Sequence, residues 1–417
     1  MRPLFIICMV FLLTVTRVQA RIIEVGAGTN NPTIRMALGL AIDGDTLRVH
    51  AGTYKEGGLV ITRPLVIMGT GWPVLDGEDK YEIMAIRADN VQVMGLNFRR
   101  PGHSSLNDIA ALRIYYRSEA TIRENRFEHS YFAIYSQGAS HCRIIGNTIS
   151  SDAQDEISSG NGIHCWKCDG MEILRNTITG HRDGIYFEFV TNSIISGNES
   201  HGNVRYGLHF MFSHHDTYNA NKFRDNGSGV AVMYSNQVTM VHNSFSGNWG
   251  SAAYGILMKD ISDSRVIANR FDGNTTALHL EGCSRTRIEG NEFSRNGWAI
   301  RIQASCENDV ITTNNFTGNT FDIATNGSLV LNTFSGNYWD RYEGYDLNHD
   351  GTGDLPYRPV SMYSMIVERN PSTLMLLHSF IVGLLDKAER VIPSFTPADL
   401  ADALPRMRRI ALTTSAP

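Results

Sequence analysis

A short phrase of the form Asn-x-(Phe/Ile) recurs along the middle of the chain and restricts its fold more than any other feature. Copies of the phrase begin at Asn125, Asn147, Asn176, Asn221, Asn243, Asn269, Asn291, Asn314 and Asn332, and Asn198 begins a degenerate copy. The usual spacing is about 22 residues, a period typical of solenoids. One repeat therefore corresponds to one coil.

A second phrase lies between successive copies: Gly or Ala, an aliphatic residue, and then alternation, as in Gly184-Ile-Tyr and Gly207-Leu-His. Period-two alternation bounded by Gly and Asn predicts short strands with one buried face. Two or three such strands per coil, stacked in register, form a right-handed parallel β-helix, so the predicted class is all-β. We expect Asn to occupy left-handed corners and to pair its amide along the stack. The Phe or Ile two residues later should stack inside.

The first 20 residues read as a secretory signal peptide. Arg2 precedes an apolar run at 4–13, and Val18-Gln-Ala20 resembles a cleavage site. A membrane anchor is the alternative, but the run is too short to span a bilayer. We therefore expect a soluble protein outside the cytoplasm. The net charge of −5 gives no indication of nucleic-acid binding.

The ends of the solenoid should be closed by helices. Asn31-Pro32 followed by apolar residues at helical spacing predicts a helix over the first coil. An open end would expose apolar side chains and unpaired backbone groups. We predict a β-helix over residues 21–356, including this cap and an Asp-rich loop at 340–354. A helical tail at 357–417 follows.

Alignment of the coils places outward side chains in vertical columns, because residues i and i+2 of a strand share a face. The first column contains Tyr135, His164, Tyr186, His209, Ala231, Leu257, His279 and Arg301. The second column contains Gln137, Trp166, Glu188, Met211, Met233, Lys259, Glu281 and Gln303. We expect both columns to be exposed on one face of the solenoid.

The two columns contain soft metal ligands. Neighbouring coils lie about 4.8 Å apart, so Met211 should stack on Met233, with His209 on the same strand as Met211. Thioether and imidazole groups suit Cu(I). The candidate copper ligands are His209, Met211, Met233, His164 and His279. The alternative is a docking face for a protein or a sugar, for which Trp166, Tyr186 and Glu188 are the candidate partner-binding residues.

Carbohydrate chemistry is the usual alternative on this fold. Lyases, hydrolases and epimerases place paired acids, or an acid with a basic residue, in such a groove. The candidates here are Asp183, Glu188 and Glu281, but apolar residues separate them. No acid pair stands out.

An Asp-rich loop follows the last coil. Asp346, Asn348 and Asp350 occupy positions 1, 3 and 5 of an EF-hand-like loop, and Asp354 is a further candidate ligand. Position 12 is Tyr357 rather than Glu. The two interpretations are a structural calcium site and a metal-free turn.

The tail after residue 357 contains apolar helices interrupted by Pro371 and Pro393. None is long enough to span a membrane. They could close the open end of the solenoid, but they hold more apolar surface than a cap needs. We expect part of that surface, including Phe380 and Leu384, to attach to a membrane partner.

Five cysteines follow the predicted signal peptide. Cys283 and Cys306 occupy the same position in adjacent coils, where a disulfide is geometrically possible. Cys165 and Cys168 form a C-x-x-C pair, and the alternation predicts that both are buried core residues rather than a redox or metal pair.

Several longer phrases resemble the NosD family of periplasmic maturation proteins of nitrous oxide reductase. They are Gly180-His-Arg-Asp-Gly-Ile-Tyr-Phe-Glu-Phe189, Arg205-Tyr-Gly-Leu-His-Phe-Met-Phe-Ser213, Gly318-Asn-Thr-Phe-Asp-Ile-Ala-Thr325 and Gly336-Asn-Tyr-Trp-Asp340. The resemblance implies a non-enzymatic β-helix that assists copper delivery to the reductase. The implied partners are an ABC transporter permease and ATPase of the NosY and NosF type, a copper-carrying lipoprotein of the NosL type, and the reductase itself. A metal-free docking scaffold and a carbohydrate-active enzyme remain the alternatives.

Overall fold

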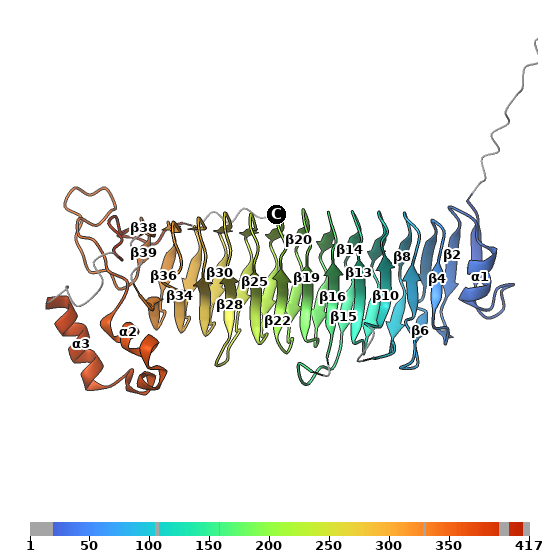
Figure 1. Ribbon diagram of the computed structural model, residues 1–417, viewed down its shortest axis with the longest axis horizontal. Coiled ribbons are helices and arrows are strands. Elements are labelled where there is room, and N and C mark those ends of the chain that lie inside the picture. Colours follow the sequence, from blue (N-terminus) through green and yellow to red (C-terminus); the bar gives the residue numbers. More distant parts are fainter. Residues whose placement is uncertain (1–19, 105–107, 158, 328–330, 392–399, 412–417) are drawn as a thin grey trace, which may run out of the picture.

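The chain forms a single parallel β-helix of stacked coils (Figure 1). The computed structural model describes residues 20–104, 108–157, 159–327, 331–391 and 400–411. The apolar run of the predicted signal peptide lies outside these residues. Each regular coil contributes one strand to each of three parallel sheets, which confirms the predicted fold.

The 14-stranded sheet consists of β1 (Ile22–Val25), β2 (Thr46–His50), β5 (Val66–Thr70), β8 (Gln92–Met94), β11 (Thr121–Arg123), β14 (Arg143–Ile145), β17 (Glu172–Leu174), β20 (Ile194–Ser196), β23 (Thr217–Asn219), β26 (Thr239–Val241), β29 (Arg265–Ile267), β32 (Arg287–Glu289), β35 (Val310–Thr312) and β38 (Thr333–Ser335). The 13-stranded sheet consists of β3 (Thr53–Tyr54), β6 (Val74–Asp76), β9 (Asn97–Arg99), β12 (Arg126–Glu128), β15 (Thr148–Ser150), β18 (Thr177–Thr179), β21 (Glu199–His201), β24 (Lys222–Arg224), β27 (Ser244–Ser246), β30 (Arg270–Asp272), β33 (Glu292–Ser294), β36 (Asn315–Thr317) and β39 (Tyr338–Trp339).

The 12-stranded sheet consists of β4 (Leu59–Ile61), β7 (Met84–Ile86), β10 (Ala110–Tyr115), β13 (Phe132–Gln137), β16 (Asn161–Trp166), β19 (Asp183–Glu188), β22 (Tyr206–Met211), β25 (Ser228–Met233), β28 (Tyr254–Lys259), β31 (Thr276–Glu281), β34 (Trp298–Ile302) and β37 (Phe321–Thr325). The helices are α1 (Ile34–Leu40), α2 (Met362–Arg369), the 3₁₀ helix η1 (Pro371–Leu376) and α3 (Phe380–Val391).

The repeated asparagines form a continuous amide ladder, as predicted. Each Nδ2 donates to the Oδ1 of the Asn one coil further on, at 3.0–3.2 Å. The ladder contains Asn125, Asn147, Asn176, Asn198, Asn221, Asn243, Asn269, Asn291, Asn314 and Asn337. Asn332 is not a member, because its Oδ1 accepts from Asp309 N at another corner. The copy of the phrase at Asn332 was therefore wrongly assigned.

The left-handed backbone angles belong to the residue before each Asn rather than to the Asn itself. Glu124 has φ 54° and Gly146 has φ 62°, for example. The Asn contributes its amide, which satisfies buried backbone groups of neighbouring coils that no strand pairs. The prediction that Asn occupies the left-handed position is therefore wrong, although its position at the corner is right.

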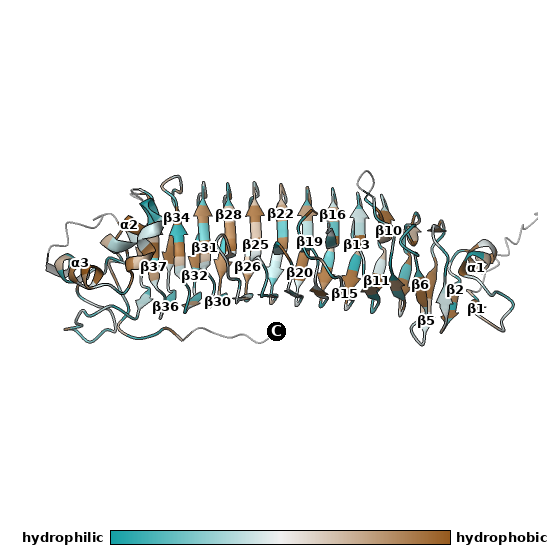
Figure 2. Ribbon diagram, turned by 90° about the horizontal axis from the view of Figure 1, so that it is seen from below, coloured by the Kyte–Doolittle hydropathy of each residue, from teal (hydrophilic) through white to brown (hydrophobic). Residues whose placement is uncertain are grey.

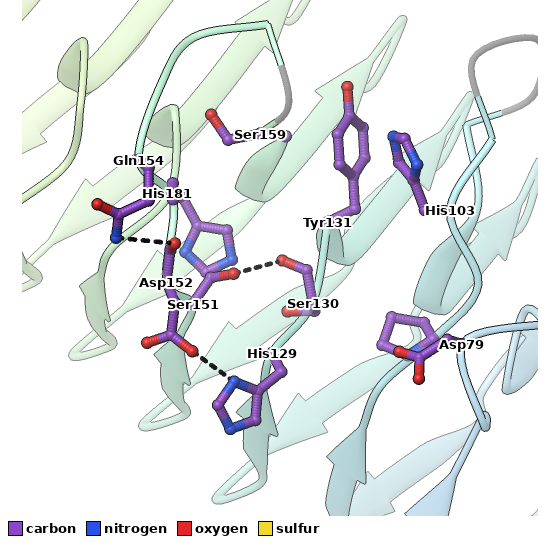
Figure 3. A pocket seen from close by; sticks show the side chains of 13 residues that line it. Asp79, His103, His129, Ser130, Tyr131, Ser151, Asp152, Gln154, Ser159 and His181 are labelled. Atoms are coloured by element: carbon purple, nitrogen blue, oxygen red, sulfur yellow. Dashed lines mark hydrogen bonds and ion pairs between the residues drawn. The ribbon is translucent and has the colours of Figure 1, made fainter.

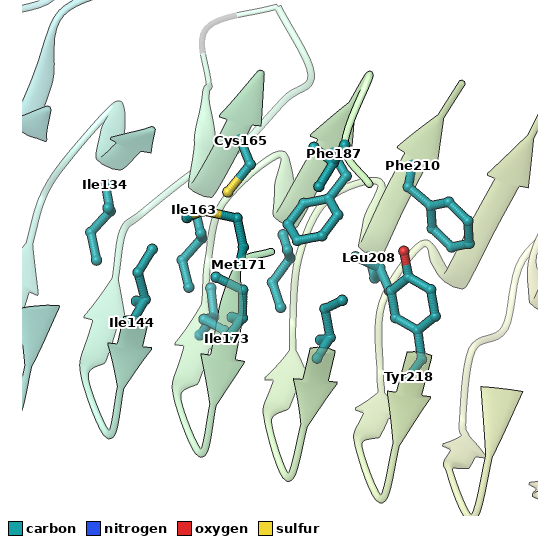
Figure 4. Close-up of a cluster of buried hydrophobic side chains, with 14 of the residues drawn as sticks. Ile134, Ile144, Ile163, Cys165, Met171, Ile173, Phe187, Leu208, Phe210 and Tyr218 are labelled. Atoms are coloured by element: carbon teal, nitrogen blue, oxygen red, sulfur yellow. The ribbon is translucent and has the colours of Figure 1, made fainter. Parts of the chain in front are cut away.

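Apolar side chains fill the centre of every coil (Figure 4). Phe223, Phe245, Phe271, Phe293 and Phe316 stack face to face at 4.8–5.5 Å, each from the strand after its ladder Asn. Burial of these rings, about 1.5–3 kcal/mol each, is the main force that holds the coils together.

Helix α1 closes the first coil, as predicted, and packs against β1, β2 and β4. It begins later than the Asn31-Pro32 signal suggested. Thr33 is the N-cap and accepts from Met36 N at 3.2 Å. The Glu56 carboxylate accepts from the next two free backbone N–H groups, at Ile34 and Arg35. Glu56, which is distant in the sequence, thus caps the helix N-terminus in place of Asn31.

The last coil is closed in two ways. Helix α2 packs against β37, and Glu368 of α2 accepts from Arg301 at 2.8 Å. Residues 400–411, which were predicted to be helical, instead run back along the last coils, and Asp402 terminates the Asn ladder. The Asp402 carboxylate accepts from Asn337 Nδ2 and from Trp339 Nε1. The segment runs along the coils instead of forming the predicted helix, and this course places Asp402 at the end of the ladder.

Candidate functional site

The outer face of the 12-stranded sheet carries the two predicted columns, and their register is confirmed. His209 lies between Tyr186 of β19 and Ala231 of β25 in adjacent strands. Met211 lies directly opposite Met233. Side chains far apart in the sequence therefore do form vertical rows on this face.

The first column is much less exposed than predicted. His209, His279 and Tyr135 are each only 6% exposed. A third column, which the sequence alignment missed, runs beside it and includes Asp183, Tyr206, Tyr254 and Trp298. The Tyr206 ring lies 4.9 Å from the His209 ring, and the Tyr254 ring lies 5.2 Å from the His279 ring. These large rings cover the histidines.

His209 belongs to a polar cluster built on β19 and β22. The Arg205 guanidinium donates to both oxygens of Asp183, with Nε at 2.9 Å from Oδ1. The same guanidinium lies 3.2 Å from His209 Nδ1. Arg182 Nε is 3.6 Å from Asp183 Oδ2. His209 therefore faces the Arg205 guanidinium, and Asp183 lies near two cationic groups.

Burial alone would raise the pKa of Asp183, but its hydrogen bonds and charge interaction with Arg205 help to outweigh burial and lower this pKa. Asp183 thus remains a carboxylate locked to arginine. Glu281 pairs with Lys259 at 2.9 Å, and Glu188 accepts from the Tyr186 hydroxyl at 3.4 Å. The three acids considered for carbohydrate chemistry are engaged in separate contacts, so they do not form a catalytic pair.

The other two candidate histidines lie elsewhere along the column. His164 Nδ1 is 3.1 Å from Asn161 Nδ2, and burial lowers the pKa of His164 to about 3. Burial lowers the pKa of His279 to about 4. Tyr186 separates His164 from His209, while Ala231 and Leu257 separate His209 from His279. Across the described ranges, no three His, Cys, Asp or Glu side chains are placed to share one metal ion.

The second column is more open and forms a soft patch. Met211 and Met233 are both half-buried and stack on each other. Beside them, at the corner of the coil, the exposed rings of Phe189, Phe212 and Tyr234 stack at 5.1–5.2 Å. We call these five side chains the Met-aromatic patch. Its apolar centre is typical of a protein interface.

The predicted partner-binding residues border this patch. Trp166 is half-buried under the Lys167 ammonium, which lies 4.4 Å from the centre of its ring. Tyr186 and Glu188 are half-buried and bonded to each other. A charged and aromatic rim therefore adjoins the methionines on the side of the earlier coils.

A second methionine pair, missed in the sequence, lies on the 14-stranded sheet. Met68 of β5 is directly opposite Met94 of β8, and both are half-buried. Arg123 Nη2 donates to Met94 Sδ at 3.1 Å. A cation on the sulfur opposes the binding of another cation there, so this pair serves as a natural control for Met211 and Met233.

Two concave sites lie away from the Met-aromatic patch. One, of about 290 Å³, lies between the 13- and 12-stranded sheets and is lined by His103, His129, Tyr131 and His181 (Figure 3). His129 bonds to Asp152 at 2.6 Å. The second site, of about 570 Å³, lies over β10 and β13.

Comparison with known sequences shows which family this chain resembles. The family described as "Periplasmic copper-binding protein (NosD)" matches residues 145–344, which include the whole Met-aromatic patch. A relative from Stutzerimonas stutzeri, named "Probable ABC transporter binding protein NosD", is 28% identical over 92% of each chain. A protein of the same name from Pseudomonas aeruginosa is 29% identical over 89% of this chain and 90% of its own length. This chain is therefore similar to NosD proteins along most of its length.

Solved structures resemble this chain in fold alone. A Dettilon tailspike protein aligns with TM-score 0.60 at 15% identity, over 75% of this chain and 70% of its own. The A-module of the Azotobacter vinelandii mannuronan C-5 epimerase AlgE4 aligns with TM-score 0.57 at 14% identity, over 72% and 94%.

The Asp-rich loop gives no support for the predicted calcium site. Its oxygens are occupied by backbone N–H groups of the same loop: Asp346 accepts from Gly351 at 2.9 Å, and Asp350 accepts from Thr352 at 2.7 Å. Asp354 accepts from Leu347 at 2.7 Å, and Asn348 donates to Asp350 at 3.0 Å. Ligands aimed at the backbone do not converge on an ion, so the calcium prediction is replaced by a self-bonded turn.

The five described cysteines are buried free thiols. Cys283 and Cys306 are thus not joined, and Cys165 and Cys168 are core residues as predicted. Burial raises the pKa of Cys142 to about 12. A thiol held protonated is a poor metal ligand.

Proposed function

We propose that this chain binds Cu(I) transiently at the sulfur atoms of Met211 and Met233. The observation that carries the proposal is their direct opposition in β22 and β25, half-buried and without the cation that blocks Met94. Two thioethers select soft Cu(I) over harder ions and bind it weakly enough to release it. The description of the family as copper-binding supports this choice of cargo.

Within this proposal, His209, His164 and His279 are no longer ligands of one ion. His209 is the nearest of them to the methionines, on the same strand as Met211, but its Nδ1 faces Arg205. The remaining ligands would come from the protein that delivers or receives the copper. Handover across an interface is then the function of the Met-aromatic patch, with Trp166, Tyr186 and Glu188 at its rim.

The wider function proposed is assistance in the maturation of nitrous oxide reductase, without catalysis. The family resemblance supports a copper-carrying lipoprotein of the NosL type as the donor and the reductase as the recipient. The relatives' name, ABC transporter binding protein, supports a permease and ATPase of the NosY and NosF type as further partners.

Attachment to the inner membrane would use helix α3. Phe380 is 85% exposed and Leu384 is 56% exposed, one helical turn apart, and Met375 of η1 is 91% exposed. Figure 2 shows hydrophobic segments along the ribbon of α3. None of the described helices has the length and apolar character needed to cross a bilayer. We propose that this apolar face docks onto the permease, while α2 holds the tail on β37.

Copper binding is tested by the double variant Met211→Leu and Met233→Leu, with Met68→Leu and Met94→Leu as the matched control. Leu keeps the volume and removes only the sulfur, so each double variant should fold normally. Cu(I) affinity should fall at least about tenfold, ~1.4 kcal/mol, in the first variant alone. Equal loss in both variants, or in neither, would sink the proposal.

Docking is tested by Phe380→Gln with Leu384→Gln, against Leu347→Gln, which is 76% exposed in the Asp-rich loop. Co-purification with the permease from solubilised membranes should be lost only in the first variant. Copper content of the reductase should fall with it. Unchanged co-purification would refute the role of α3.

A further inference from the structure

The polar cluster around His209 contains more hydrogen-bond donors than acceptors. Both oxygens of Asp183 accept from Arg205, and Arg182 Nη2 donates to Asn161 Oδ1 at 3.2 Å. Arg182 Nε and His209 Nε2 are buried and have no hydrogen-bond partner among the described residues. A buried group without a partner costs about 1–3 kcal/mol. The cluster thus favours one further acceptor.

The position of the His209 proton follows from its neighbour. Arg205 has only donors, so His209 Nδ1, at 3.2 Å from Nη2, must accept. The Asp183 oxygen, at 3.6 Å from the same Nδ1, is too far away to accept a proton from it. The proton of the neutral imidazole therefore sits on Nε2.

His164 is fixed in the same tautomer. Asn161 Oδ1 accepts from Arg182, which turns the Asn161 Nδ2 donor toward His164 Nδ1 at 3.1 Å. His164 Nδ1 accepts, and Nε2 carries the proton. Burial keeps this imidazole neutral, because it lowers the pKa of His164 to about 3.

These tautomers oppose metal binding. A metal-binding histidine usually donates its second ring N–H to an acceptor, which leaves the ligating nitrogen free. In His164 and His209 the supporting groups are donors, so the remaining Nε2 is protonated. The two imidazoles are therefore equipped to bind an acceptor and not a cation.

We propose that Arg182, Arg205 and His209 form a binding site for a carboxylate on a partner protein. The two guanidiniums outnumber the single Asp183 carboxylate, and their side chains are 27% and 28% exposed. Guanidinium groups recognise carboxylates through paired N–H donors. The His209 Nε2 is buried, and the Tyr206 ring lies 4.9 Å from the His209 ring. A carboxylate that displaces the Tyr206 ring would reach this N–H.

The chain itself indicates that an acid is favoured here. Burial alone would lower the pKa of Arg205, but its hydrogen bonds and charge interaction with Asp183 raise it, and the charge of the Glu156 carboxylate, in the exposed loop after β15, adds to the rise. The negative charge of Glu156 thus acts on the same guanidinium that would hold an external carboxylate. The choice of a protein as occupant rests on the proposed function, because Met211 follows His209 on one strand. A protein that exchanges copper at Met211 would reach Arg205 from the same side.

The tautomers are tested directly on the full chain labelled with ¹⁵N-histidine and ¹³C-methyl methionine. His164 and His209 should show protonated Nε2, and Cu(I) should shift the Met211 and Met233 methyl signals while leaving both imidazoles unchanged. Protonated Nδ1, or imidazole signals lost on Cu(I) addition, overturns this inference. Unshifted methyl signals would instead refute the copper proposal, so the two failures are distinguishable.

Carboxylate binding is tested with a hexaglutamate peptide, with hexaglutamine as the neutral control. Arg182→Gln should weaken hexaglutamate binding about tenfold, ~1.4 kcal/mol, and Arg182→Lys should restore part of it. Glu156→Gln should tighten binding about threefold, which a purely structural role for the loop does not predict. Equal binding of hexaglutamine, or tighter binding of oligogalacturonate than of hexaglutamate, overturns the assignment to a protein carboxylate.

Discussion

The first and second columns lie on the same strands, yet they have opposite characters. In β22, His209 is 6% exposed and held by Arg205, whereas Met211, two residues later, is half-buried beside exposed aromatic rings. The difference arises from what stands on either side. The third column covers the first with Tyr206, while the second column borders the open corner of the coil.

This contrast teaches that an outward position on a β-helix is not by itself an accessible one. Cross-strand neighbours on the same face shield each other when a column of large rings stands beside them. The covered first column therefore holds fixed, partly charged side chains, and the open second column is accessible to soft metal ions and to partner proteins.

Asp183→Ala is expected to have the largest effect on stability, and it tests whether the first and second columns differ. It removes the fully buried Asp183 carboxylate and leaves the half-buried Arg205 without its ion-pair partner. The expected cost lies at the lower end of the about 3–5 kcal/mol that breaking a buried pair costs. Met211→Leu should cost less than about 1.5 kcal/mol. Urea unfolding followed by circular dichroism measures both. The control is Asp263→Ala, which removes an exposed partner of Arg285 and should change little. Equal effects of Asp183→Ala and Met211→Leu would erase the distinction between the columns.

The pH dependence of stability sharpens the comparison. The pKa values of His164 and His279, about 3 and about 4, lie below their ordinary 6.5. The unfolded chain then binds protons that the folded chain does not. The stability that these two neutral histidines contribute is complete above about pH 6.5 and falls as the pH drops toward 4, by up to about 1.4 kcal/mol per pH unit for each histidine.

The measurement is the urea midpoint of unfolding between about pH 7.5 and about pH 4.5. The variant His164→Gln with His279→Gln should flatten the slope. Met211→Leu with Met233→Leu should leave it unchanged, since methionine does not titrate. A slope unaffected by the histidine variant would contradict the burial of the first column.

The smallest effect is expected at Phe212, which has φ 49° at the open corner. Phe212→Gly removes a left-handed strain of about 1–2 kcal/mol and loses stacking worth about 0.5–1.5 kcal/mol. The net change in the free energy of unfolding should stay within about 1 kcal/mol. Phe210→Ala, on the inward side, should cost about 3–5 kcal/mol. A large loss at Phe212 would mean that the corner rings support the fold.

The repeat was enough to predict the fold, the columns and the Asn ladder, because a period of about 22 residues fixes register directly. The burial of the first-column side chains on the 12-stranded sheet was not predictable. Tyr206 and Asp183 precede a Gly-aliphatic phrase, and strand alternation does not indicate that their side chains return over the neighbouring column. Asp402 was missed because it joins the ladder from a segment with no repeat. The tautomer of His209 depends on Arg205, which lies across a corner rather than in the strand pattern.

The acceptor at the end of the Asn ladder has a consequence for how the molecule is assembled. Each completed coil leaves an amide N–H that the carbonyl of the following asparagine fills, so growth can continue indefinitely in one direction. Only a group with no proton to pass on can end such a series, and Asp402 is that group. The final segment therefore terminates the Asn ladder, so that a second molecule cannot extend the stack through the same amide hydrogen bonds.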